Sequence, residues 1–176
     1  RFYMDRRSSE WRQAVAERGY RWGHAALGIS TVHIWSDPAK EPGLLGRAKA
    51  NLHHWLENRT DFNCFFFSDD RKRECCQLLN QVRPVTIVAY AGKVAELAVF
   101  VRENPGLLKW RVKYVLTGAE GLQPGQRELI TEQLGGQVFM SYGCREMKLI
   151  GMESDHQNGY HLSDDNLVVE VVGDDN

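Results

Sequence analysis

Several features that would assign a chain to a special class are missing from these 176 residues. No apolar run reaches the roughly 18 residues that a membrane-spanning helix needs, and no stretch resembles a secretory signal peptide. The formal net charge is −1 at pH 7, so there is no electrostatic footprint for nucleic acid or an anionic membrane. These absences argue against a nucleic-acid-binding protein and against a membrane-spanning one.

Cysteine is scarce and poorly spaced for a scaffold of disulfides or zinc. The cysteines are Cys64, Cys75, Cys76 and Cys144, and no CxxC pair occurs among them. Neither a disulfide framework nor a zinc ribbon is therefore supported. Reduced thiols, and with them a cytoplasmic location, are the expectation.

The composition itself is that of an ordinary globular domain. Hydrophobic residues make up 43% of the chain and charged residues 26%, which is enough apolar surface for a core. The length favours one domain or slightly more. Tryptophans, including Trp35 and Trp55, are expected in the core or partly buried.

Strand-like and helix-like segments alternate through the middle of the chain. Strands are expected at 30–35, 62–68, 85–90, 112–117, 137–142 and 166–173. Helices are expected at 5–19, 42–59, 69–84, 91–104 and 123–135. This alternation predicts an α/β fold, with a three-layer, mostly parallel sheet flanked by helices.

In such sheets ligands bind beyond the carboxyl ends of the strands, so the loops after the expected strands are the places to search. Two of these loops, "TGAEGL" at 117–122 and "SYGCRE" at 141–146, combine glycine with glutamate. Glycine lets a ligand approach the backbone, a tyrosine ring offers a stacking face, and a carboxylate can bind Mg²⁺. Together these features suit a nucleotide site, although "TGAE" alone also fits a plain helix start.

The same segments carry a resemblance to a known family. From Val112 to Glu153 the chain resembles the adenylate-forming (AMP-forming) superfamily, above all its phenylacetate–CoA ligase-like branch with homologues linked to capsule polysaccharide synthesis. Members have a strand ending in a Gly-Ala-Glu-like turn, a helix of the type P-x-Q-R-E-L-I, and a strand ending in Tyr-Gly-x-Thr/Arg-Glu. The rest of the chain resembles the large domain of the family more loosely.

The resemblance implies roles for particular residues. Those implied to bind the nucleotide are Gly118, Ala119, Glu120, Ser141, Tyr142 and Gly143, with Tyr142 stacking on adenine. Those implied to wall an acyl pocket are Tyr90, Ala91, Gly92 and Cys144, although a plain strand-to-helix turn is an equal interpretation of the first three. Glu146 would bind Mg²⁺ on the ATP phosphates. Arg145 replaces a threonine found in many members and could contact phosphate through its guanidinium. Glu146 and Arg145 are therefore the expected catalytic residues.

The resemblance further implies that residues 1–176 are a partial N-terminal adenylating domain. The phosphate loop would precede residue 1 and a small C-terminal domain would follow residue 176, so this piece alone would not turn over. The implied parent is a carboxylate–CoA ligase that uses ATP and Mg²⁺ to convert an aryl or acyl acid into an acyl-adenylate, then transfers it to a thiol such as CoA. The alternative is a non-catalytic homologue that binds nucleotide or acyl groups. Uncovered apolar surface would favour a homodimer.

Histidines near the C-terminus leave two interpretations open. His156 and His161 lie in "ESDHQNGYH", close to the carboxylates of Glu153 and Asp155. The segment is either a polar turn around Asn158 and Gly159 or a metal site, for which a cysteine ligand is missing.

Overall fold

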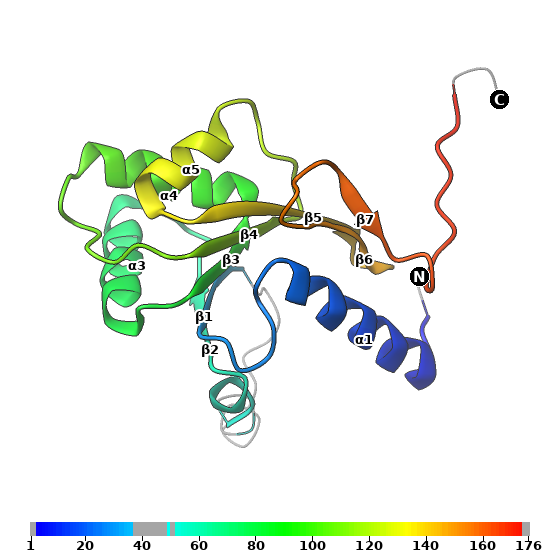
Figure 1. Cartoon of the computed structure of the whole chain (residues 1–176). Helices are drawn as coiled ribbons and strands as arrows, with labels where there is room; N and C mark the ends of the chain where they lie inside the picture. Colours follow the sequence, from blue (N-terminus) through cyan, green and yellow to red (C-terminus); the bar gives the residue numbers. More distant parts are fainter. Residues whose placement is uncertain (1–2, 37–48, 50–51, 174–176) are drawn as a thin grey trace.

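A seven-stranded sheet runs through the middle of the molecule in the computed structural model, which describes residues 3–36, 49 and 52–173 (Figure 1). The strands are β1 (Thr31–Trp35), β2 (Arg59–Asn63), β3 (Thr86–Tyr90), β4 (Tyr114–Gly118), β5 (Gln137–Cys144), β6 (Lys148–Glu153) and β7 (Tyr160–Leu162). The helices are α1 (Arg6–Trp22), α3 (Asp69–Val82), α4 (Ala91–Glu103) and α5 (Gln126–Leu134).

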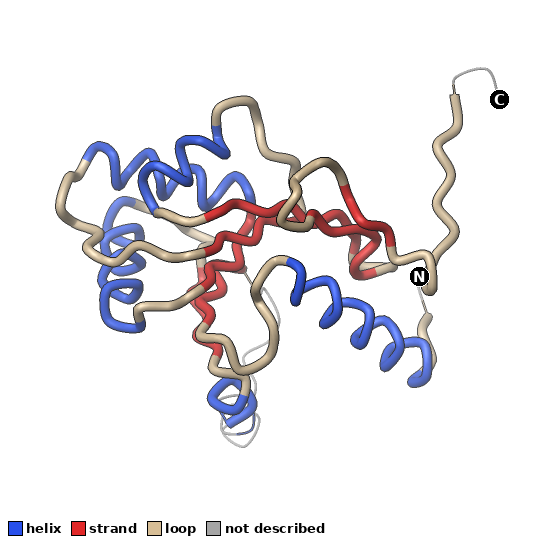
Figure 2. The backbone as a smooth tube through the Cα atoms, in the orientation of Figure 1, coloured by secondary structure: helices blue, strands red, loops and turns tan. Residues whose placement is uncertain are grey.

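The sheet is mostly parallel, as the alternation predicted. Its order is β2-β1-β3-β4-β5-β6-β7. Strands β2 to β5 in this order pair in parallel, whereas β6 and β7 are added antiparallel at the β5 edge. Figure 2 shows the strands of the sheet in red. The carboxyl ends of β1, β3, β4 and β5 therefore lie along one edge of the parallel part.

Helices cover both faces of the sheet, which makes three layers and confirms the predicted fold class. Successive side chains on a strand point to opposite faces. Ile87 and Ala89 accordingly pack into the core that α3, α4 and α5 cover. Val88, between them, joins a second and smaller core beneath α1. Figure 1 shows α1 on one side of the sheet and α3, α4 and α5 together on the opposite side.

Helix α1 lies close against β6, at one side of its face. Gly19 allows this approach, because a Cβ placed there would lie 2.0 Å from the Cδ2 atom of Leu149. Ala16 is buried in the same contact. Because α1 packs against β6, the described residues cover the part of this face formed by β1 and β3 only partly, and this asymmetry creates the space for a site.

Capping residues explain where two helices begin. The Asp5 carboxylate accepts the Ser8 N–H at 2.6 Å and caps the start of α1. The Ser68 hydroxyl accepts the Arg71 N–H at the start of α3. None of the helices within the described part of the chain is long and apolar enough to cross a membrane.

Two predicted strands are wrong. The segment 62–68 was expected as a strand, but β2 ends at Asn63, and Phe65 and Phe66 are exposed on the loop that follows. The segment 166–173 was also expected as a strand, yet it forms no regular structure, and its valines are largely exposed. Strands β6 and β7 were not predicted. Of the helix expected at 42–59, residues 52–56 are helical, and the stretch before residue 52 lies outside the described residues except for residue 49.

Candidate functional site

The carboxyl ends of four parallel strands open onto a cavity of about 600 Å³ between the sheet and α1. Several predicted site residues line it together. From the ends of β3 and β4 these are Tyr90, Gly118 and Ala119. From the end of β5 and the following turn they are Ser141, Gly143, Cys144 and Arg145. Residues far apart in the sequence thus converge because parallel strands end at a common edge.

The turn after β4 presents backbone to this cavity. Gly118 is tightly placed, since a Cβ there would lie 2.8 Å from the Ser141 Oγ atom. Ala119 has a φ of 67°, a left-handed conformation that is unfavourable for a residue with a Cβ. The Ser141 hydroxyl donates to the Thr117 carbonyl at 2.9 Å, which ties the end of β5 to the end of β4. The two predicted motifs are therefore physically joined.

Glu120, for which the resemblance implied nucleotide binding, contacts the turn after β3. Its carboxylate accepts the Gly92 N–H at 3.1 Å, at the amino end of α4, where negative charge is favourable. Ala91 is fully buried in the core. None of these three residues lines the cavity. They connect the turn after β3 to the turn after β4 behind it.

Two stacked aromatic rings form one wall of the cavity. The rings of Trp35 and Tyr90 lie with their centroids 3.9 Å apart and their planes 18° apart. The Tyr90 hydroxyl lies 3.2 Å from the Ser36 Oγ atom. The sequence interpretation expected Trp35 in the core or partly buried and did not assign it to the site. Its position at the last residue of a parallel strand adjacent to Tyr90 was the signal that it belongs to the site.

Tyr142 and Glu146 lie next to the cavity in sequence but do not line it. Tyr142 is 54% exposed and its ring is tilted against Tyr160 at a centroid distance of 6.0 Å. Glu146 is exposed in the turn 145–147 between β5 and β6, and its backbone carbonyl accepts a hydrogen bond from Arg12. The roles implied for both side chains stay predictions.

The hairpin itself explains Gly143. A Cβ at this position would lie 2.0 Å from the Lys148 carbonyl oxygen across the hairpin. Any side chain would therefore disturb the β5–β6 pairing, with or without a ligand.

The inner part of the cavity contains polar groups that sequence reasoning missed. His33 and Tyr20 line it, together with the charged side chains of Glu17, Glu57 and Arg59. Burial, helped by the Arg59 charge, lowers the pKa of His33 to about 4, so its imidazole is neutral at pH 7. Burial also raises the pKa of Tyr20 above its ordinary value, so its hydroxyl stays protonated. Both groups can donate and accept hydrogen bonds.

Histidines at the C-terminal side form polar contacts. The His161 Nε2 atom lies 2.8 Å from the Ser154 hydroxyl, and the His24 Nε2 atom lies 2.9 Å from an Asp155 oxygen. Across the residues that the structure describes, no group of three or more histidine, cysteine or acidic side chains could hold a metal ion.

No family model and no curated protein sequence matches this chain. Among solved structures it is similar to 2-hydroxyisobutyryl-CoA ligase in an open conformation with 2-HIB-AMP and CoA. The TM-score is 0.58 at 18% identity, over 90% of this chain and 37% of that one. It is also similar to CmiS6, with a TM-score of 0.54 at 17% identity over 81% of this chain and 33% of that one.

A third similar structure is the luciferase-like enzyme from the nonluminescent mealworm Zophobas morio. Its TM-score is 0.50 at 17% identity, over 80% of this chain and 31% of that one. The chain thus spans between 31% and 37% of the length of these three solved structures. The likeness establishes the fold, which is that of part of these larger proteins.

Proposed function

We propose that this chain forms the central part of the adenylating domain of an AMP-forming carboxylate–thiol ligase. The observation that carries the proposal is the convergence of the "TGAE" and "SYGCRE" segments on one cavity, lined by Gly118, Ala119, Ser141 and Arg145. The fold supports it, because a similar structure is of a CoA ligase bound to an acyl-AMP and CoA. The Arg145–Glu146 pair supports the phenylacetate–CoA ligase-like branch.

The proposed reaction has two steps. A carboxylate oxygen of the acid attacks the α-phosphorus of ATP, and the bond to pyrophosphate breaks to leave an acyl-adenylate. The sulfur of a thiol, such as CoA, then attacks the acyl carbon, AMP leaves with its oxygen, and the thiol proton passes to solvent. The protein would contribute mainly positioning and charge stabilisation. No protein nucleophile is needed, so Cys144 acts as part of the wall.

Each part of the cavity suits one part of this chemistry. The guanidinium of Arg145 lies at the edge where phosphate would be held and can bind two phosphate oxygens at once. The glycine at 118 and the turn after it leave backbone accessible to a nucleotide. The flat wall of Trp35 and Tyr90 suits the apolar part of an acid.

The carboxylate of Glu146 fits a magnesium ion, which is commonly bound by one or two carboxylates and the phosphates of its substrate. This side chain lies in the exposed turn directly after Arg145, so it is accessible to a nucleotide held there. When bound, Mg²⁺ would supply charge neutralisation for the phosphates.

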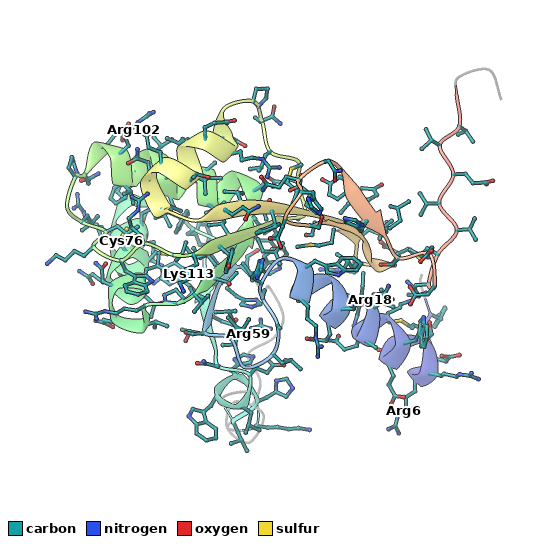
Figure 3. The ribbon with its side chains drawn as sticks, in the orientation of Figure 1. Arg6, Arg18, Arg59, Cys76, Arg102 and Lys113 are labelled. Carbon is teal, nitrogen blue, oxygen red and sulfur yellow. The ribbon has the colours of Figure 1, made fainter. Side chains whose placement is uncertain are left out.

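The test is ATP–pyrophosphate exchange by the full-length protein with Mg²⁺ and a panel of aryl and acyl acids. We expect exchange with some of these acids and a loss of about 100-fold on Arg145→Gln, because a charge-stabilising donor is removed. Arg102→Gln is the matched control, since Arg102 is exposed on α4, across the sheet from the cavity (Figure 3). If the protein binds nucleotide but exchanges with no acid, it is a binding module and the proposed activity is wrong.

A further inference from the structure

The cavity does not end at the strand termini. A smaller cavity of about 40 Å³ continues along β1 toward Thr31, its first residue. The two cavities share Glu17, Tyr20, His33, Glu57 and Arg59. These residues therefore form an inner end, opposite the end lined by Gly118 and Arg145.

Two polar groups at this inner end have no hydrogen-bonding partner among the residues that the structure describes. Within the described residues, neither the imidazole of His33 nor the hydroxyl of Tyr20 makes a hydrogen bond to another side chain or to backbone. Polar groups in a partly buried site favour a hydrogen-bonding partner, and here the cavity is the direction from which one can come. Each of the two groups offers one donor and at least one acceptor.

The charges around the inner end favour an uncharged ligand group. Glu17 and Glu57 bring carboxylates to it, and both would repel an anion. The Arg59 guanidinium is already paired with the Asp61 carboxylate at 2.7 Å. A hydroxyl can donate to one partner and accept from the other, so it matches the inner end better than a second carboxylate does.

The outer end of the cavity is lined by cations and therefore favours a negatively charged ligand group. Arg145 and Lys148 line it, and the Lys148 amine donates to Gln13 at 2.7 Å. An acid would therefore enter with its carboxylate toward these cations. The stacked rings of Trp35 and Tyr90 lie along the wall near this end and suit a planar body.

We propose, building on the proposed function, that the acid activated here is planar and carries a hydroxyl group at the end remote from its carboxylate. The hydroxyl binds Tyr20 and His33 at the inner end of the cavity. The carboxylate remains at the outer end near Arg145. Tyr20 and His33 thus determine which acids are accepted and take no part in the chemical step.

The test compares matched acids that differ only in this hydroxyl. Binding of 4-hydroxyphenylacetate and phenylacetate, and of 4-hydroxybenzoate and benzoate, is measured by calorimetry on the full-length protein. We expect at least one hydroxylated acid to bind about tenfold tighter than its partner, which is the effect of one or two good hydrogen bonds. Equal affinity within both pairs, or no binding of either hydroxylated acid, would overturn the proposal.

Variants connect this preference to the two residues. Tyr20→Phe removes one oxygen atom and should reduce the preference to about twofold or less, because one of the two hydrogen-bonding partners of the ligand hydroxyl is lost. His33→Phe should act in the same direction. The controls are Tyr3→Phe and His156→Phe at exposed positions outside the cavity. A preference that survives Tyr20→Phe would assign the selectivity elsewhere.

The outcome also separates this proposal from the proposed function. A hydroxyl preference in binding without pyrophosphate exchange would uphold the selectivity and refute the ligase activity. Exchange that is equally fast with both members of each pair would uphold the ligase activity and refute the selectivity.

Discussion

The imidazole of His33 occupies a position in the middle of a strand where burial disfavours its charged form. The folded chain binds a proton there only near pH 4, whereas the unfolded chain binds one near the ordinary pKa of 6.5. Between these values the unfolded state holds more protons than the folded state, so stability falls as the pH is lowered. The contribution is fully present above pH 6.5 and is lost by pH 4.

We predict that this effect amounts to about 3 kcal/mol of unfolding free energy across the window. Urea unfolding followed at several pH values between 7.5 and 4 measures it. Other groups also titrate in this range, so the comparison is between the wild type and His33→Phe, in which the fall in stability should be smaller. His156→Phe, in an exposed turn, should keep the wild-type dependence. Identical pH profiles for wild type and His33→Phe would show that this imidazole is not shielded from protonation.

Individual site residues were predictable from sequence to different extents. Gly118, Ala119, Ser141 and Arg145 were predicted as site residues, and they line the cavity because parallel strands bring their ends together. His33 and Tyr20 were not found. A mid-strand histidine faces the site only because of the order of strands and the placement of α1, and neither is visible in local sequence.

At the scale of elements, the side chains of Glu153 and Arg127 form hydrogen bonds with the backbone of β5 beyond the end of its pairing with β6. The Glu153 carboxylate, on a residue only 4% exposed, accepts from the Met140 N–H at 2.7 Å and from Arg127 at 2.9 and 3.1 Å. Arg127 also donates to the Val138 carbonyl. Backbone groups of β5 that have no strand partner here are thus satisfied by an ion pair, which connects α5 to the strand leading into the site.

We therefore predict that Glu153→Ala lowers the unfolding free energy by about 3 kcal/mol. The substitution removes the carboxylate that pairs with the partly buried guanidinium of Arg127 and accepts the Met140 N–H. Glu10→Ala is the matched control. It breaks an ion pair with Arg6 in which both side chains are exposed, so no measurable change in unfolding free energy is expected. Urea unfolding of both variants distinguishes them. A similarly small effect of Glu153→Ala would mean that the backbone groups at the β5 edge find other hydrogen-bonding partners.

The errors made in assigning strands from the sequence have opposite causes, and both concern strand pairing. The valines at 168–172 have strong strand propensity, but among the described residues no neighbouring strand pairs with them, and propensity alone does not supply partners. The strand β6 was missed for the converse reason. Its pairing depends on the hairpin turn 145–147, which sequence reasoning read only as part of a ligand motif.

At the scale of the whole molecule, the cavity results from unequal coverage of the sheet. Helices α3, α4 and α5 cover one face, whereas α1 packs closely on β6 on the other (Figure 1). The cavity lies beside α1 and is lined by residues of β1 and β3. The fold class could be predicted because alternation of strands and helices is a property of the whole chain. The position of α1 could not, because it depends on the close contact at Gly19 with Leu149.

This arrangement predicts that a ligand in the cavity protects segments that are distant in sequence. Binding of an acid should slow amide hydrogen exchange together in the second half of α1, around Gln13 to Tyr20, and in the turn at Gly118 and Ala119, because the cavity lies between them. Helix α3 provides the internal control, since it covers the opposite face. Exchange measured by mass spectrometry with and without saturating acid makes the comparison. Protection of α3 equal to that of α1 would indicate global stabilisation, and protection of neither segment would place the acid outside this cavity.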